Sequence, residues 1–128
     1  MAITGLHIPY DENTPITKVV VNERNVMNYY KFVQGGPAEA GHLNVDGVEL
    51  AVYVNSRYGT FETDMVNKRA TVLFAIAGVG MLGGAVRGDA LAVGPAGNSD
   101  YEKSLDPALS QFLLELDWAP LMEQVQLA

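Results

Sequence analysis

Alternating and helically spaced apolar residues predict most elements of this 128-residue chain. The β-branched run from Ile16 to Val21 predicts the first strand. The helix predicted after it is capped by Asn22 and ends at Gly35-Gly36-Pro37, where glycine permits a left-handed turn and proline stops the helix. One face of this helix is apolar and is expected to pack on a sheet, through Val26, Tyr29, Tyr30 and Val33.

A β-hairpin is predicted between His42 and Val54, because Asp46-Gly47 is a dipeptide that favours a type I′ turn. In the second arm, every other residue is apolar and is expected to face the core: Val48, Leu50, Val52 and Val54. The alternate residues are expected to face solvent or a partner: Glu49, Ala51, Tyr53 and Asn55.

The second half of the chain predicts further helices and one strand. The segment Asn67 to Ala77 fits a helix capped by Asn67; its β-branched residues also fit a strand, and we favour the helix. Ala85 to Val93 is typical of a strand with a break or bulge at Gly88-Asp89. Near the end of the chain, Asp106 caps a helix with Pro107 as its first residue, and a short amphipathic stretch follows Pro120.

Together these elements predict an α+β fold in one small domain. We expect a mixed or antiparallel sheet that includes a β-hairpin and packs against two to four helices. Residues 1–15 are predicted to form an irregular arm, because Gly5, Pro9, Asn13 and Pro15 interrupt them. Residues 16–100 are the expected core domain, and residues 101–128 a helical tail that packs on the core or on a partner.

Composition narrows the chemistry available to the chain. With 48% hydrophobic residues it can bury a core, and without cysteine it has no disulfides and no thiolate nucleophile or ligand. His7 and His42 are too few for a three-histidine metal site, and no Gly-x-Ser-x-Gly elbow occurs. We therefore predict no enzyme, no cofactor and no metal. No signal peptide or membrane helix is visible, so a cytoplasmic protein without membrane contact is expected.

The net charge of −7 opposes direct binding to nucleic acid, because phosphates attract clustered Lys and Arg. The stretch from Ser104 to Ala128 carries no base and four acids, Asp106, Glu115, Asp117 and Glu123. The hypothesis of an acidic DNA mimic, which would occupy the DNA site of a DNA-binding protein, therefore stays open, although four dispersed carboxylates are few for that role.

The string Gly78-Val79-Gly80-Met81-Leu82-Gly83 has the spacing of a dinucleotide-binding fingerprint. Gly84 and Gly88 follow closely, which disfavours the helix that such a motif must open. The chain also leaves little room for a doubly wound sheet. We interpret this string as a connecting loop.

A candidate anion site surrounds the predicted start of the helix at Asn67. Free amides at a helix N-terminus favour anions, and the densest basic group of the chain lies nearby: Arg57, Lys68 and Arg69. The alternative is a solvated face that pairs with neighbouring acids.

Several short motifs carry a family resemblance. They are Val33-Gln34-Gly35-Gly36, Val52-Tyr53-Val54-Asn55, Asn67-x-x-Ala70-Thr71 and Gly88-Asp89-Ala90-Leu91-Ala92-Val93-Gly94. Over residues 17 to 95 the chain resembles a family of small uncharacterised domains of actinobacteria and their phages. The resemblance implies a phage-type or accessory origin and supplies no catalytic residues.

Aromatic and apolar side chains predict a protein interface on the hairpin region and on the tail. The candidates are Tyr53, Tyr58, Phe61, Trp118, Leu121, Met122 and Val125. The leading hypothesis is a small non-catalytic protein-binding accessory protein, phage-encoded and acting on a host protein in the host cytoplasm. A homo-oligomer is a further expectation. The alternative is a small-ligand protein that binds or sequesters a nucleotide or anion, and the weaker alternative is the DNA mimic.

Overall fold

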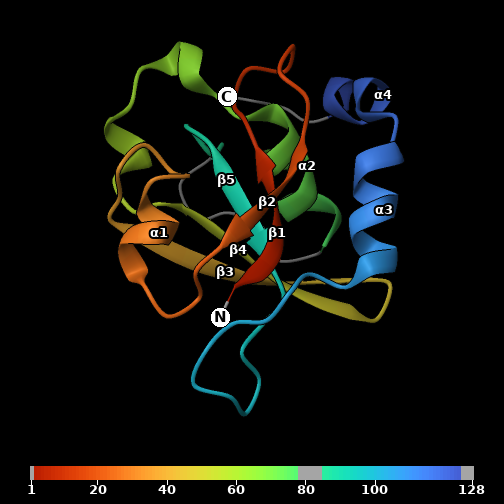
Figure 1. The fold of residues 1–128 in the computed structure, drawn as a ribbon. Helices are drawn as coiled ribbons and strands as arrows, with labels where there is room; N and C mark the ends of the chain where they lie inside the picture. Colours follow the sequence, from red (N-terminus) through yellow and green to blue (C-terminus); the bar gives the residue numbers. More distant parts are fainter. Residues whose placement is uncertain (1, 78–84, 125–128) are drawn as a thin grey trace.

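The computed structural model describes residues 2–77 and 85–124, in which an antiparallel sheet carries helices on both faces (Figure 1). The strands are β1 (Ile3–Ile8), β2 (Thr17–Val21), β3 (Ala38–Val45), β4 (Val48–Asn55) and β5 (Ala90–Val93), in the order β2-β1-β5-β4-β3. The helices are α1 (Val26–Tyr30), α2 (Lys68–Ile76), α3 (Pro107–Glu115) and α4 (Trp118–Glu123). The predicted α+β fold is confirmed, and every described strand pair is antiparallel.

The N-terminal segment is part of the sheet, so the prediction of an irregular arm over residues 1–15 is wrong for β1. This strand lies between β2 and β5, and Leu6 and Ile8 are fully buried. Gly5 is the residue that made the segment look irregular. A Cβ at Gly5 would lie 2.6 Å from the Ala92 carbonyl oxygen, so glycine here permits close approach of β5.

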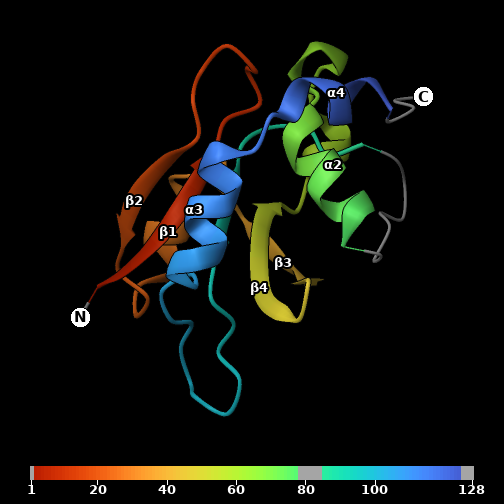
Figure 2. The ribbon, with the colours of Figure 1, turned by 90° about the vertical axis from the view of Figure 1, so that its right-hand side faces the viewer.

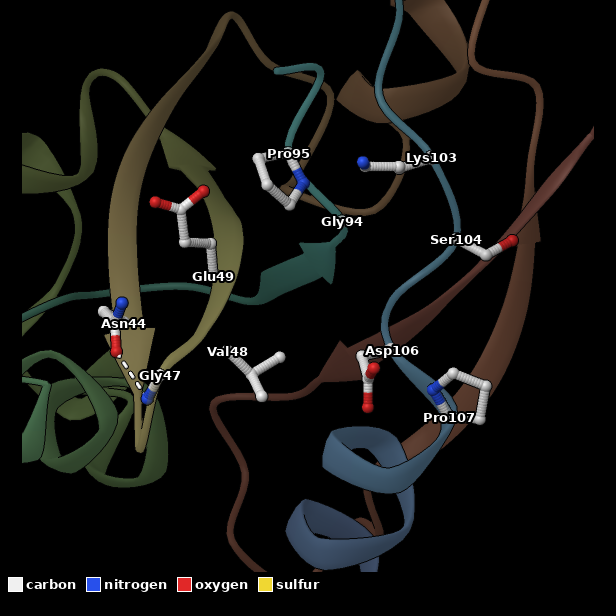
Figure 3. Close-up of a pocket in the computed structure, with 10 residues that line it drawn as sticks. All are labelled: Asn44, Gly47, Val48, Glu49, Gly94, Pro95, Lys103, Ser104, Asp106 and Pro107. Carbon is white, nitrogen blue, oxygen red and sulfur yellow. Dashed lines mark hydrogen bonds between the residues drawn. The ribbon is translucent and has the colours of Figure 1, made fainter.

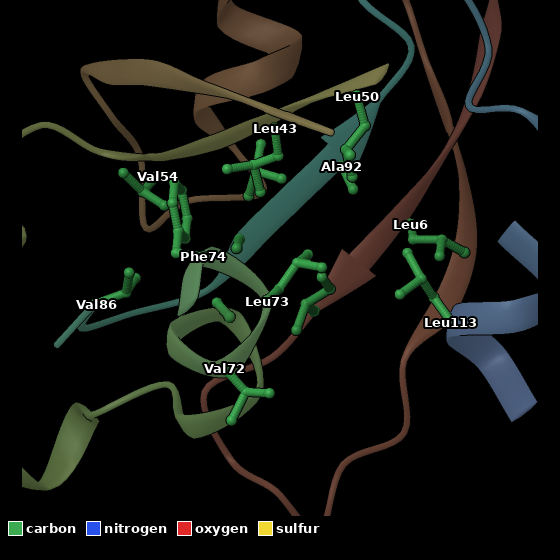
Figure 4. Packing of buried hydrophobic residues seen from close by; sticks show 14 of the residues in the cluster. Leu6, Leu43, Leu50, Val54, Val72, Leu73, Phe74, Val86, Ala92 and Leu113 are labelled. Carbon is green, nitrogen blue, oxygen red and sulfur yellow. The ribbon is translucent and has the colours of Figure 1, made fainter. Parts of the chain in front are cut away.

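Two apolar cores lie on opposite faces of the sheet. The larger one lies between the sheet and α2, α3 and α4; Figure 4 shows Leu73 and Phe74 of α2 directed toward the sheet. The smaller one lies under α1 and contains Tyr29, with Leu91 and Val93 of β5. All four residues of β5 are fully buried, because this central strand has a core on each side.

The β3–β4 hairpin has the predicted turn. Asp46 and Gly47 have φ angles of 53° and 88°, and a type I′ turn requires positive φ at both positions. The prediction that the second face of β4 meets solvent or a partner holds for the exposed Glu49 and is wrong for Ala51, Tyr53 and Asn55. Ala51 and Asn55 on that face are buried, and the Tyr53 ring lies 4.8 Å from the Tyr29 ring, because α1 covers this side of the sheet.

The helix caps are partly as predicted. Asn67 caps α2 and Asp106 caps α3, with Pro107 as the first residue of α3. For α1 the prediction is wrong in detail, because Asn25 and not Asn22 accepts the capping hydrogen bond, from the Met27 amide.

None of the described helices is long and apolar enough to cross a membrane. The string interpreted as a connecting loop, 78–84, and the candidate interface residue Val125 lie outside the described residues.

Candidate functional site

An open groove of about 610 Å³ lies where β4 begins and β5 ends (Figure 3). One wall is the hairpin, with Glu49, and the other is the segment before α3, with Lys103 and Asp106. Gly94 brings the two sides together, because its amide donates to the Lys103 carbonyl at 2.8 Å. A side chain at position 94 would collide with the Ser104 carbonyl, so only glycine permits this approach.

The groove presents two carboxylates and one amine. The Asp106 Oδ1 atom accepts from the Leu109 amide at 3.0 Å as the α3 cap, and Asn44 Oδ1 accepts from the Gly47 amide at 2.8 Å. The first bond holds the start of α3 and the second holds the hairpin turn, so both walls of the groove are ordered. The Glu49 carboxylate and the Lys103 amine are on exposed residues, and they are the groups that could meet a ligand.

A half-buried histidine–aspartate pair joins β1 to the segment before β5. The His7 Nε2 atom lies 2.8 Å from Asp89 Oδ2, and Asp89 Oδ1 accepts from the Tyr10 amide at 2.9 Å. Burial raises the pKa of Asp89, but hydrogen bonds from His7, Tyr10 and Gln34 outweigh burial and hold that pKa below its usual value.

This pair fastens chain segments together. The Asp89 backbone amide also donates to Gln34 Oε1 at 2.8 Å, so Asp89 bonds β1, the loop after it and the segment after α1. Among the described residues, no serine or threonine hydroxyl hydrogen-bonds to His7, and the Phe32 ring lies 5.7 Å from its imidazole. The geometry is that of a structural hydrogen-bonded pair. This pair was not predicted from the sequence, because His7 and Asp89 are 82 positions apart.

The predicted anion site does not exist as proposed, because two of its members are buried and hold the backbone. Asn67 is fully buried, and its Nδ2 atom donates to the carbonyls of Ile8 and Gly88 at 2.9 and 3.0 Å. The Arg69 Nη2 atom donates to the carbonyls of Pro9, Asp11 and Thr14 at 2.8, 3.1 and 2.7 Å. Burial lowers the pKa of Arg69 and nearby acids oppose that shift. These side chains fasten the loop after β1.

The other two basic residues of that prediction are exposed. Arg57 follows β4, and its backbone amide donates to Asn55 Oδ1 at 2.9 Å. The Lys68 Nζ atom lies 3.7 Å from Glu12 Oε2, with both side chains nearly half exposed. Lys68 also lines a hollow of about 280 Å³ with Met122 of α4, so the structure brings a predicted ligand residue beside a predicted interface residue.

The Glu102 carboxylate, in the loop before α3, lies beside the phenols of Tyr29 and Tyr53. The Tyr29 hydroxyl donates to Glu102 Oε1 at 3.1 Å. Burial, together with Glu102, raises the pKa of both Tyr29 and Tyr53. The two phenols and Glu102 therefore attach the loop before α3 to the α1 face of the sheet.

The remaining interface candidates differ in burial. Trp118 is a core residue whose indole N–H donates to the Leu113 carbonyl at 3.2 Å, so the expectation that it faces a partner is wrong. The other four described candidates are partly buried: Tyr58, Phe61, Leu121 and Met122. Phe61 packs close to Gly88, and Leu121 and Met122 pack on the larger core.

Exposed apolar side chains precede and follow the turn between β2 and α1. Of the six large apolar residues that are exposed in the described chain, Val26 and Met27 begin α1 and Tyr101 lies against Arg24, while Val20, in β2, faces the opposite side of the sheet from α1. The turn is tight, because the Asn22 amide donates to Asn28 Oδ1 at 2.7 Å. The Arg24 guanidinium lies 4.7 Å from the centre of the Tyr101 ring, which places the loop before α3 against it. We call Val20, Arg24, Val26, Met27 and Tyr101 the β2–α1 corner.

Comparison with protein-family models, with curated proteins and with solved structures finds no match to this chain. The resemblance to small domains of actinobacteria and their phages therefore stays a prediction.

Proposed function

We propose that this protein is a small non-catalytic protein-binding accessory protein that contacts its partner through the β2–α1 corner. The observation that carries the proposal is the exposure of apolar side chains there. Val20 is 67% exposed, Met27 62% and Val26 58%, although the chain buries two apolar cores elsewhere. Several large apolar residues left exposed within eight positions of the chain favour a segment that another protein covers.

The residue types at the corner support a protein partner. Methionine, tyrosine and arginine are enriched in protein interfaces, and methionine adapts its shape to the surface it meets. The Arg24–Tyr101 contact holds the guanidinium over an aromatic ring, which limits its freedom before binding. The family resemblance adds a phage–host setting in the host cytoplasm, and this setting belongs to the proposal.

Affinity capture from extracts of the producing cells tests the proposal. Tagged wild-type protein is compared with Met27→Asp at the corner and with Ile76→Asp as the matched control. Ile76 is 48% exposed on α2, so both changes place a carboxylate on an exposed apolar site. We expect a protein that wild type and Ile76→Asp retain equally and that Met27→Asp retains at least tenfold less. Equal capture by all three proteins, or no protein above background, would contradict the proposal.

The groove favours a second candidate function, the binding of a small ligand. Its volume of about 610 Å³ lies in the usual range for ligand sites. The exposed Glu49 carboxylate and Lys103 amine suit a ligand that carries both an ammonium group and an acidic group. A thermal-shift screen with amino acids tests it, because a ligand that binds the native state raises the melting temperature. A shift in wild type that persists in Glu49→Gln would rule out the groove as the site.

A further inference from the structure

The sheet ends in two strands that have a neighbour on one side only (Figure 2). β2 pairs with β1 alone, and β3 pairs with β4 alone. An edge strand presents backbone N–H and C=O groups along its outer side, and these groups can pair with an added strand.

The two edges differ in the side chains that flank them. β3 exposes polar residues, Glu39, His42 and Asn44, which are typical of an edge protected from association. β2 is a run of threonine, lysine and three valines, and its Val20 is the most exposed large apolar residue of the described chain. β-Branched residues favour strand pairing, so β2 is the better receptor for an added strand.

Charge distinguishes the β2 edge from the rest of the molecule. Residues 16–38 hold three of the eight basic residues, Lys18, Arg24 and Lys31, and one of the fifteen acidic residues, Glu23. All three basic residues are exposed, whereas Glu23 is buried. The remaining chain has five basic and fourteen acidic residues. Arg24 already lies 3.8 Å from Glu23 and against Tyr101, which Asp100 and Glu102 flank, so among the described residues the free basic group of the β2 edge is Lys18.

We propose that β2 accepts an extended acidic segment of the partner protein as a sixth strand of the sheet. This inference rests on the proposed function and identifies the partner's chemistry. Backbone groups of the segment pair with the outer edge of β2, an apolar side chain covers Val20, and a carboxylate lies near Lys18.

A second copy of this chain is disfavoured as the occupant. A two-fold symmetric dimer through β2 would place the same basic surface on itself, and like charges repel. Lys18 has the further effect of protecting the free edge, since lysine on an edge strand opposes unwanted pairing. The same lysine then selects for an acidic strand.

The test uses ¹⁵N-labelled full-length protein and two synthetic peptides. One peptide alternates valine and glutamate, and the other alternates valine and lysine. We expect the acidic peptide, at millimolar concentration, to shift and protect the amides of Thr17–Val21. Lys18→Glu should weaken this binding by about tenfold, because reversing one nearby charge changes the binding free energy by about 1–2 kcal/mol. Glu39→Lys, a charge reversal of equal size and opposite sign on the β3 edge, should change it less than about twofold.

Three results would overturn the inference: no shift in β2 with the acidic peptide, equal binding of the lysine peptide, or shifts centred on β3. Line broadening that grows with protein concentration in the absence of peptide would also overturn it, because it would show that copies of this chain occupy the edge. If affinity capture finds a corner-dependent partner and the peptides fail, protein binding stands and strand addition fails. If capture also fails, both proposals fall.

Discussion

Replacing Asn67 with aspartate tests how strongly one buried side chain holds the two halves of the fold together. The Asn67 side chain is fully buried, and its Oδ1 atom accepts from the Ala70 amide at 2.9 Å as the α2 cap. Its Nδ2 atom donates to the carbonyls of Ile8 and Gly88. Asn67→Asp keeps the shape of the side chain and the α2 cap. It replaces the Nδ2 donor with a carboxylate oxygen that faces the carbonyl oxygens of Ile8 and Gly88.

The expected loss of stability follows from those two hydrogen bonds. Each buried carbonyl left without a donor costs roughly 1–3 kcal/mol, so the unfolding free energy should fall by about 2–6 kcal/mol. The whole stability of a domain is about 5–15 kcal/mol. The loss should also depend on pH. Burial and the two carbonyls raise the pKa of the new carboxyl group in the folded state, so the loss is largest above that pKa. It shrinks as pH falls, because the protonated group can donate to one carbonyl.

Urea denaturation followed by tryptophan fluorescence measures this effect, since Trp118 is the only tryptophan and is buried. Asn98→Asp is the matched control, because it makes the same chemical change on an exposed loop. The control should alter stability by less than about 0.5 kcal/mol. A loss below about 1 kcal/mol for Asn67→Asp, or one that does not change with pH, would refute the reasoning.

Three further predictions concern the segments that surround β1. Arg69→Lys should cost about 1–3 kcal/mol and speed proteolytic cleavage in residues 9–15, because the shorter lysine side chain does not bring its ammonium to the position of Nη2, which bonds all three carbonyls; unchanged cleavage in limited proteolysis would contradict this. Asp89 has a depressed pKa, so it stabilises the fold above its unfolded-state pKa, and this stability is lost as pH falls below about 4. In an acid titration Asp89→Asn should therefore lose less stability than wild type over that range, and an equal loss would contradict the assignment. Gly5→Ala should lower the melting temperature, with a cost of about 1–3 kcal/mol, because the added methyl meets the Ala92 carbonyl; an unchanged melting temperature would show that β5 can move away.

Features with local causes could be predicted from the sequence. The Asp46-Gly47 turn depends on two adjacent residues that tolerate positive φ, and the Asn67 and Asp106 caps bond amides three positions along the chain. Features with distant causes could not be predicted. β1 was missed because Gly5 looks like a break until β5 lies beside it.

The candidate sites show the same division. Arg69 is basic and close to a helix start, which favoured an anion site, but the carbonyls it binds are 55 to 60 positions away. Asn67 was identified as a cap, while its bonds to Ile8 and Gly88 depend on how the chain folds back. The alternation of β4 was read correctly, but only the structure shows that α1 covers its second face.

Site-specific photo-cross-linking from the β2–α1 corner tests the central claim most directly. A benzophenone amino acid replaces Met27 in one protein and Ile76 in a second, and both are irradiated in the producing cells. Both positions are exposed and apolar, so labelling by random collision should be similar. We expect a discrete adduct with one other protein from position 27 and none from position 76. No adduct from position 27, or the same adducts from both positions, would contradict a protein-binding function at this corner.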